Sequence, residues 1–195
     1  MNKVAKTYKS LALVFIILAF LWNMVNAFFS YYFYLDTSDM VRVSFGLLFI
    51  LAIIMAKKHI AAAVLYGASA LAVVGDIFVQ VKNIGSMDKH ACMLIVSCMF
   101  DVLVYVILIC LVVKFGIKNE KHEKGILPMA LCALPAVFSL ISDLCNIVMG
   151  KLYMSPREST VLSFIGILFL GLFYYVGSLS VIEAADNGAE GDDKA

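Results

Sequence analysis

The stretch ACMLIVSCMFDVLVYVILICLVV, residues 91–113, holds a single charged side chain, Asp101, among its 23 residues. A helix of about 20 apolar residues is long enough to cross the hydrocarbon core of a bilayer. A transmembrane β-strand would alternate apolar and polar residues, whereas this stretch ends in the continuous apolar run VILICLVV. The segment therefore predicts a membrane-spanning helix.

The composition of the whole chain extends this prediction. Of its 195 residues, 63% are hydrophobic and 15% are charged, whereas soluble domains are closer to about 45–50% apolar and about 25% charged. A soluble domain of this size leaves roughly a third of its unfolded surface exposed, so it could not hide this excess from water. The composition excludes a water-soluble enzyme, a nucleic-acid-binding domain and a disordered protein, and it makes the lipid bilayer the expected partner.

Six apolar segments are predicted to span the membrane: residues 10–34, 41–56, 60–81, 91–113, 125–149 and 160–185. The second is the shortest, so full crossing is left open there. We expect an all-α, polytopic membrane helical bundle of six transmembrane helices arranged as three hairpins. This transmembrane domain would occupy residues 1–185, and residues 186–195 would form a disordered acidic cytoplasmic tail.

The basic residues predict the orientation. If the N-terminus is inside, the inner segments hold Lys3, Lys6, Lys9, Lys57, Lys58, Lys114, Lys118, Lys121, Lys124 and Lys194, and the outer segments hold Arg42, Lys82, Lys89, Lys151 and Arg157. Lysine and arginine concentrate in cytoplasmic loops. We therefore expect a multi-pass protein of the cell membrane with both termini in the cytoplasm.

Three aspartates interrupt the predicted spans and are the main candidate functional residues: Asp76, Asp101 and Asp143. A charged side chain at the centre of a membrane helix costs at least about 2.5–3.5 kcal/mol, so it is a functional hypothesis by default. Counting about 1.5 Å per residue places all three between the midplane and the outer side. If they face inward, they line one cavity.

Uncharged polar residues accompany the acids at helical spacing. Four of these side chains lie on the first, third and fifth spans, and the fourth span adds a phenol four residues after Asp101; the set is Asn23, Asn26, Gln80, Asn146 and Tyr105. We predict that they join the three aspartates in a substrate- or ion-binding site. Helix-to-helix hydrogen bonding is the alternative role for the asparagines, whereas Tyr174 and Tyr175 are expected to anchor and pack the last span.

Intramembrane acids suit proton relay or the binding of a cation or a small basic solute. The sequence therefore favours a small transporter or channel-like protein over an enzyme. An intramembrane hydrolase with paired aspartates is the alternative, as is a non-catalytic subunit or accessory protein of a larger membrane complex. A homo-oligomer is also compatible with so narrow a bundle. Neither a metal-ligand cluster nor a cofactor-binding motif occurs, so no cofactor and no metal are expected.

Overall fold

The computed structural model describes residues 3–30, 37–84, 89–117, 126–148 and 157–192, and no strand occurs in these ranges. The helices are α1 (Lys3–Ser30), α2 (Thr37–Ile54), α3 (His59–Ile84), α4 (Lys89–Leu111), α5 (Ile126–Val148) and α6 (Arg157–Asp192). A 3₁₀ turn, Met55–Lys57, follows α2, and a π-helical segment, Val112–Ile117, continues α4. The prediction of an all-α chain is confirmed for the described residues.

Five of the helices are long and apolar enough to cross a membrane by length and composition. Their apolar segments are Lys3–Val25, His59–Phe78, Ile95–Phe115, Leu127–Cys145 and Ser159–Gly177, whereas the segment Val43–Lys57 is shorter. The 18 residues of α2 rise about 27 Å, just under the roughly 30 Å of a hydrocarbon core. Crossing by this helix stays a prediction.

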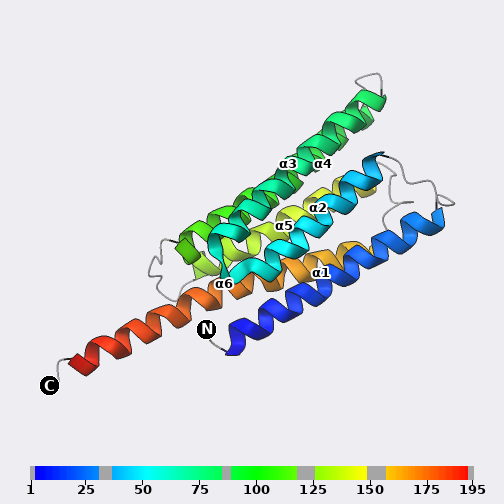
Figure 1. The fold of residues 1–195 in the computed structure, drawn as a ribbon. Helices are drawn as coiled ribbons and strands as arrows, with labels where there is room; N and C mark the ends of the chain where they lie inside the picture. Colours follow the sequence, from blue (N-terminus) through cyan, green and yellow to red (C-terminus); the bar gives the residue numbers. More distant parts are fainter. Residues whose placement is uncertain (1–2, 31–36, 85–88, 118–125, 149–156, 193–195) are drawn as a thin grey trace.

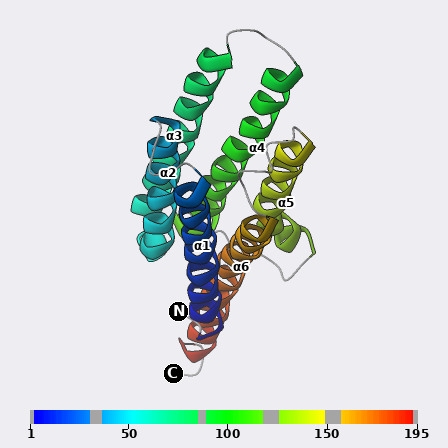
Figure 2. The ribbon, with the colours of Figure 1, turned by 90° about the vertical axis from the view of Figure 1, so that its right-hand side faces the viewer.

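The helices form one bundle in which each packs against the next and α6 returns along α1. Neighbouring helices run antiparallel, and the start of α1 and the end of α6 lie at the same end of the bundle (Figures 1 and 2). The most extensive contacts join α1 to α6, α2 to α3 and α4 to α5, whereas α1 and α2 pack least. The predicted grouping into three hairpins stays a prediction, as does the disordered tail, although α6 is helical through Asp192.

The distribution of side chains suits an apolar solvent. Large apolar side chains project outward, such as Leu71, Phe78 and Leu127, each more than 70% exposed. Small side chains face the helix contacts instead, among them Ala12 and Ala52, both fully buried. Lipid is as apolar as leucine, so helices in a membrane associate through close packing of small residues.

Glycines mark the closest approaches between helices. A Cβ at Gly171 of α6 would overlap the backbone carbonyl of Cys132 in α5. A Cβ at Gly166, also in α6, would lie 2.8 Å from the side chain of Ile16 in α1. The glycines therefore let α6 pack tightly against both of its neighbours.

We expect Gly171→Ala to destabilise the bundle. The added methyl group meets the α5 backbone, which cannot rotate away, and overpacking of this kind costs about 1–3 kcal/mol. Gly67→Ala is the matched control, because a Cβ at Gly67 meets nothing within 4 Å, and alanine favours a helix by roughly 0.5–1 kcal/mol. Thermal unfolding in detergent measures both variants, and equal stability of the two would contradict the close approach.

Candidate functional site

The three candidate aspartates lie on three consecutive helices of the bundle, α3, α4 and α5. Asp76 is only 6% exposed, and it continues the buried face of α3 that Tyr66, Ser69 and Val73 form at spacings of three and four. Residues at this spacing share one side of a helix. Asp76 therefore faces the other helices rather than the outer surface of the bundle.

Asp101 occupies the corresponding face of α4. Ser97 lies one turn before it and Tyr105 one turn after it, and both are buried, while Asp101 itself is half-buried. Asp101 is near enough to the Tyr105 phenol for the two groups to interact electrostatically. The carboxyl thus has hydroxyl-bearing neighbours on both sides along its own helix.

Two buried serines connect α4 to α5 beside Asp143. The hydroxyl oxygens of Ser97 and Ser142 are 3.0 Å apart, and the Ser97 hydroxyl also donates to the Ser142 carbonyl oxygen at 3.2 Å. Both serines are at most 2% exposed. Asp143 follows Ser142 directly and is half-buried. The serine pair sets the depth of Asp143 in the bundle relative to the depth of Asp101.

A further contact sets the depth of Asp76 on α3 relative to the serine pair. Ile77, next to Asp76, packs against Cys98 of α4, which directly follows Ser97. Ile77, the neighbour of Asp76, and Ser142, the neighbour of Asp143, therefore contact adjacent residues of α4. We call Asp76, Ser97, Asp101, Ser142 and Asp143 the acid layer.

The acids lie at neighbouring depths, with Asp101 about 7 Å nearer the terminal end than Asp143, and they do not converge on a single ion. Within the ranges that the structure describes, no three His, Cys, Asp or Glu side chains are grouped so that they could hold a metal ion. The layer follows the line α3–α4–α5, with α4 in the middle. The arrangement suits groups that act in sequence or in pairs better than a three-carboxylate metal centre.

The predicted amide residues are placed only in part. Asn23 is half-buried on α1, whose main neighbours are α6 and α2 rather than the helices of the acid layer. Its place in the predicted site stays a prediction. Asn26, Gln80 and Asn146 lie outside the side chains that the structure describes, and their roles stay predictions.

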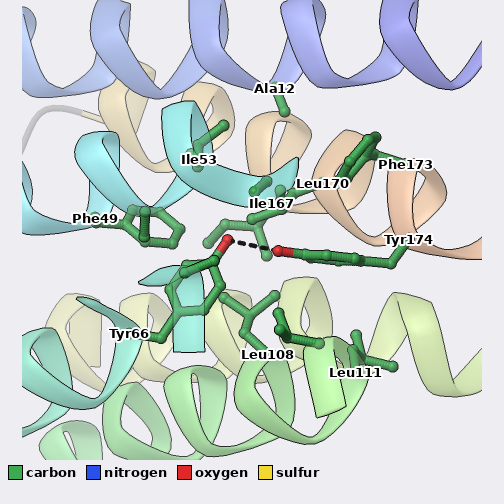
Figure 3. Close-up of a cluster of buried hydrophobic side chains, with 14 of the residues drawn as sticks. Ala12, Phe49, Ile53, Tyr66, Leu108, Leu111, Ile167, Leu170, Phe173 and Tyr174 are labelled. Atoms are coloured by element: carbon green, nitrogen blue, oxygen red, sulfur yellow. Dashed lines mark hydrogen bonds between the residues drawn. The ribbon is translucent and has the colours of Figure 1, made fainter. Parts of the chain in front are cut away.

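A buried aromatic group lies in the core of the bundle (Figure 3). Two of its members, Tyr105 and Tyr174, carry sequence-based predictions, but their grouping with Phe49 and Tyr66 was not predicted. The hydroxyl oxygens of Tyr66 in α3 and Tyr174 in α6 are 3.1 Å apart. Phe49 of α2 packs against Tyr66 and meets Tyr105 edge-on, with ring centroids 5.9 and 5.5 Å apart. We call Phe49, Tyr66, Tyr105 and Tyr174 the tyrosine cluster.

Tyr174 packs inside the bundle, as the packing role predicted for it requires. It is 3% exposed, and its hydroxyl finds its partner 108 residues away in the chain. A buried phenol normally needs such a partner. Only the pairing of α3 with α6 across the bundle reveals this partner, so the local sequence pattern carries no signal for the hydrogen bond.

The acid layer and the tyrosine cluster lie at different depths. Asp76 is ten residues further along α3 than Tyr66, which is about 15 Å along the axis. On α4, Asp101 precedes Tyr105 by one turn. Since α3 leads away from the end that holds the termini and α4 returns to it (Figure 1), the acid layer lies on the side of the cluster away from that end.

Comparison of the chain with protein-family models, with curated proteins and with solved structures finds no match.

The hydrogen bond between Tyr66 and Tyr174 predicts non-additive mutations. Either Tyr→Phe change leaves one buried hydroxyl without this partner, whereas the double change removes both hydroxyls. Hydrogen bonds between membrane helices contribute about 0.6 kcal/mol on average and up to about 1.7 kcal/mol. We expect a double-mutant cycle, measured by unfolding in detergent, to give a coupling free energy in this range.

The control for this cycle pairs Tyr66→Phe with Tyr153→Phe, a tyrosine from the sequence between α5 and α6. This pair should show no coupling. Additive effects of Tyr66→Phe and Tyr174→Phe would be the result that rules out the hydrogen bond.

Proposed function

We propose that this chain is a six-span integral protein of the cell membrane that transports or conducts a proton, a cation or a small basic solute by means of intramembrane aspartates. The observation that carries the proposal is the burial of Asp76 on the inward face of a helix in a largely apolar bundle. The lipid bilayer and this solute are its proposed partners.

Membrane insertion is supported by the outer surface of the bundle. Exposed leucine, valine and phenylalanine side chains occur along α1, α3 and α5, including Val64, Leu71, Phe78 and Leu127. Soluble monomers rarely expose large contiguous apolar patches. Together with five helices of spanning length, this surface favours lipid as the surrounding solvent.

The free-energy cost of burying the Asp76 carboxyl group supports a functional role for it. A carboxylate that only needed solvation would be cheaper at a helix end, within reach of water and lipid headgroups. Asp76 lies close to the end of the apolar segment His59–Phe78, yet its side chain turns inward and is only 6% exposed. Inward-facing intramembrane acids commonly mark ion pathways and proton relays.

The acid layer gives an order in which its residues would pass on the proton or cation. In the proposal, Asp76 and Asp101 on adjacent helices bind the proton or cation, and the Ser97–Ser142 pair connects this position to Asp143. Serine hydroxyls both donate and accept hydrogen bonds, so they serve carboxyl groups in either protonation state. Tyr105 lies on the same face of α4 as Asp101, and it also belongs to the tyrosine cluster. It therefore stands between the acid layer and the apolar core.

The tyrosine cluster supplies a barrier in the same proposal. It lies in the core of the bundle (Figure 3), on the terminal side of the acid layer. A solute bound at the acid layer would exchange with the opposite side first. Passage to the terminal side requires Tyr66 and Tyr174 to separate, which is the alternating access expected of a carrier.

We expect Asp76→Asn to reduce flux by at least roughly tenfold, the change produced by about 1.4 kcal/mol of lost binding. Asparagine keeps the size of the side chain but removes its negative charge. Proteoliposomes with an imposed membrane potential allow proton flux to be followed with a trapped pH dye. Radiolabelled sodium and methylammonium test the other two classes of solute.

Asp88→Asn is the matched control, since this acid comes from the sequence between α3 and α4. It should leave the flux unchanged. If Asp76→Asn, Asp101→Asn and Asp143→Asn all retain wild-type flux, the acids have no transport role; if wild type carries none of the three solutes, the transport proposal fails for them.

The proposed topology makes a separate prediction. Six crossings put both termini in the cytoplasm, as the excess of lysine on the terminal side favours. Fusions of a cytoplasmically active reporter at residue 2 and after Ala195 should both be active. Because α2 is short, a fusion at Lys58 is decisive: activity there supports crossing by α2, whereas inactivity places this turn on the other side.

A further inference from the structure

We propose that the seam between α1 and α2, at the end of the bundle that carries the termini, binds the phosphate headgroup of an anionic phospholipid. The inference goes beyond the proposed transport activity. It rests on membrane insertion, but not on any role of the aspartates.

Lysines from two separate parts of the chain meet at this seam. The Lys9 ammonium on α1 donates to the backbone carbonyl of Ile54, the last residue of α2, at 2.6 Å. Lys57, three residues further on, is close enough to Lys9 for the two positive charges to repel each other. The fold therefore holds two ammonium groups near each other. An anion bound between them would be attracted to both and would offset their mutual repulsion.

The donors at the seam are suited to phosphate. An ammonium has three N–H donors, and the carbonyl of Ile54 uses one from Lys9, so two remain for phosphate oxygens. Lys57 is exposed, as is Lys6, which lies one turn before Lys9 on the same side of α1. Shortly after Lys57, α3 begins at His59, and the N–H groups of a first helical turn favour anions.

The surroundings favour a lipid over a free anion. Among neighbouring helices, α1 and α2 pack together least extensively. Beside the Ile54 carbonyl, two apolar side chains of α2, Leu51 and Ile54, are each about half exposed. A phospholipid places a phosphate at the level of the lysines and acyl chains along these side chains. Basic sites between helices on the cytoplasmic side bind anionic headgroups in this way.

The test titrates the full chain in mild detergent with phosphatidylglycerol and with phosphatidylcholine, and it detects bound lipid by native mass spectrometry. We expect phosphatidylglycerol to bind in preference to phosphatidylcholine. Lys9→Gln with Lys57→Gln should weaken this binding roughly thirtyfold, since one lysine charge near an anionic lipid accounts for about fivefold. Lys9→Arg should retain it.

The matched control combines Lys3→Gln with Lys114→Gln, which removes two lysine charges from the same end of the bundle without touching the seam. An equal loss of binding in the control overturns the site, because the attraction would then be a general charge effect. Equal binding of both lipids overturns it as well. If inorganic phosphate displaces phosphatidylglycerol at equal concentration, the seam is an anion site and not a lipid site.

Folding and insertion are checked separately. If the double variant does not fold, Lys57→Gln alone tests the proposal, because that side chain is exposed, and unchanged lipid preference in it counts against the site. A wild-type protein that fails to insert into vesicles refutes the membrane proposal itself. An inserted protein without lipid preference refutes only the lipid site.

Discussion

In the hydrocarbon core of a membrane, a polar group must find its hydrogen-bond partners within the protein, because neither water nor lipid supplies them. This constraint accounts for the main features of the bundle. Backbone groups are satisfied within helices, large apolar side chains such as Leu71 turn outward, and Ser97, Ser142, Tyr66 and Tyr174 pair across helices. These four side chains hold specific helices together, whereas the buried Ser69 hydroxyl donates to the Leu65 carbonyl of its own helix.

The same constraint divides the bundle along its length. The acid layer connects α3, α4 and α5 toward one end, and the tyrosine cluster connects α2, α3, α4 and α6 nearer the other. Tyr105 lies one turn from Asp101 and packs edge-on against Phe49, so α4 takes part in both. In the proposed mechanism, a change at the acid layer would reach the cluster through this helix. Lys9 and Lys57 then mark the end of the bundle at which headgroups would be bound.

The sequence predicted the helices well, because span length and apolarity depend on local composition. The segment predicted at residues 125–149 is a helix over Ile126–Val148, and that at 60–81 is a helix over His59–Ile84. The first helix starts earlier than predicted, at Lys3, because lysines that end an apolar segment do not end a helix. Among the described helices, α2 is the one whose apolar segment, Val43–Lys57, is shorter than the others.

The site was less accessible from sequence. Helical spacing placed Asp101 and Tyr105 on one face, and the burial of Tyr105 fits that expectation. Spacing along one helix, however, carries no information about which other helix it meets. The pairs Tyr66–Tyr174 and Ser97–Ser142 join distant parts of the chain, and Asn23 lies on a helix away from the acid layer. These relations depend on the order of helices around the bundle.

The central claim is that Asp76, although buried among apolar helices, exchanges a proton or a cation with water. Infrared difference spectroscopy on the reconstituted protein measures this directly, by following carboxyl C=O bands when the pH or sodium concentration of the bath is changed. The account predicts a reversible carboxyl band that is present in wild type and absent in Asp76→Asn. A wild-type spectrum without any carboxyl response, or one that Asp76→Asn leaves intact, would contradict it.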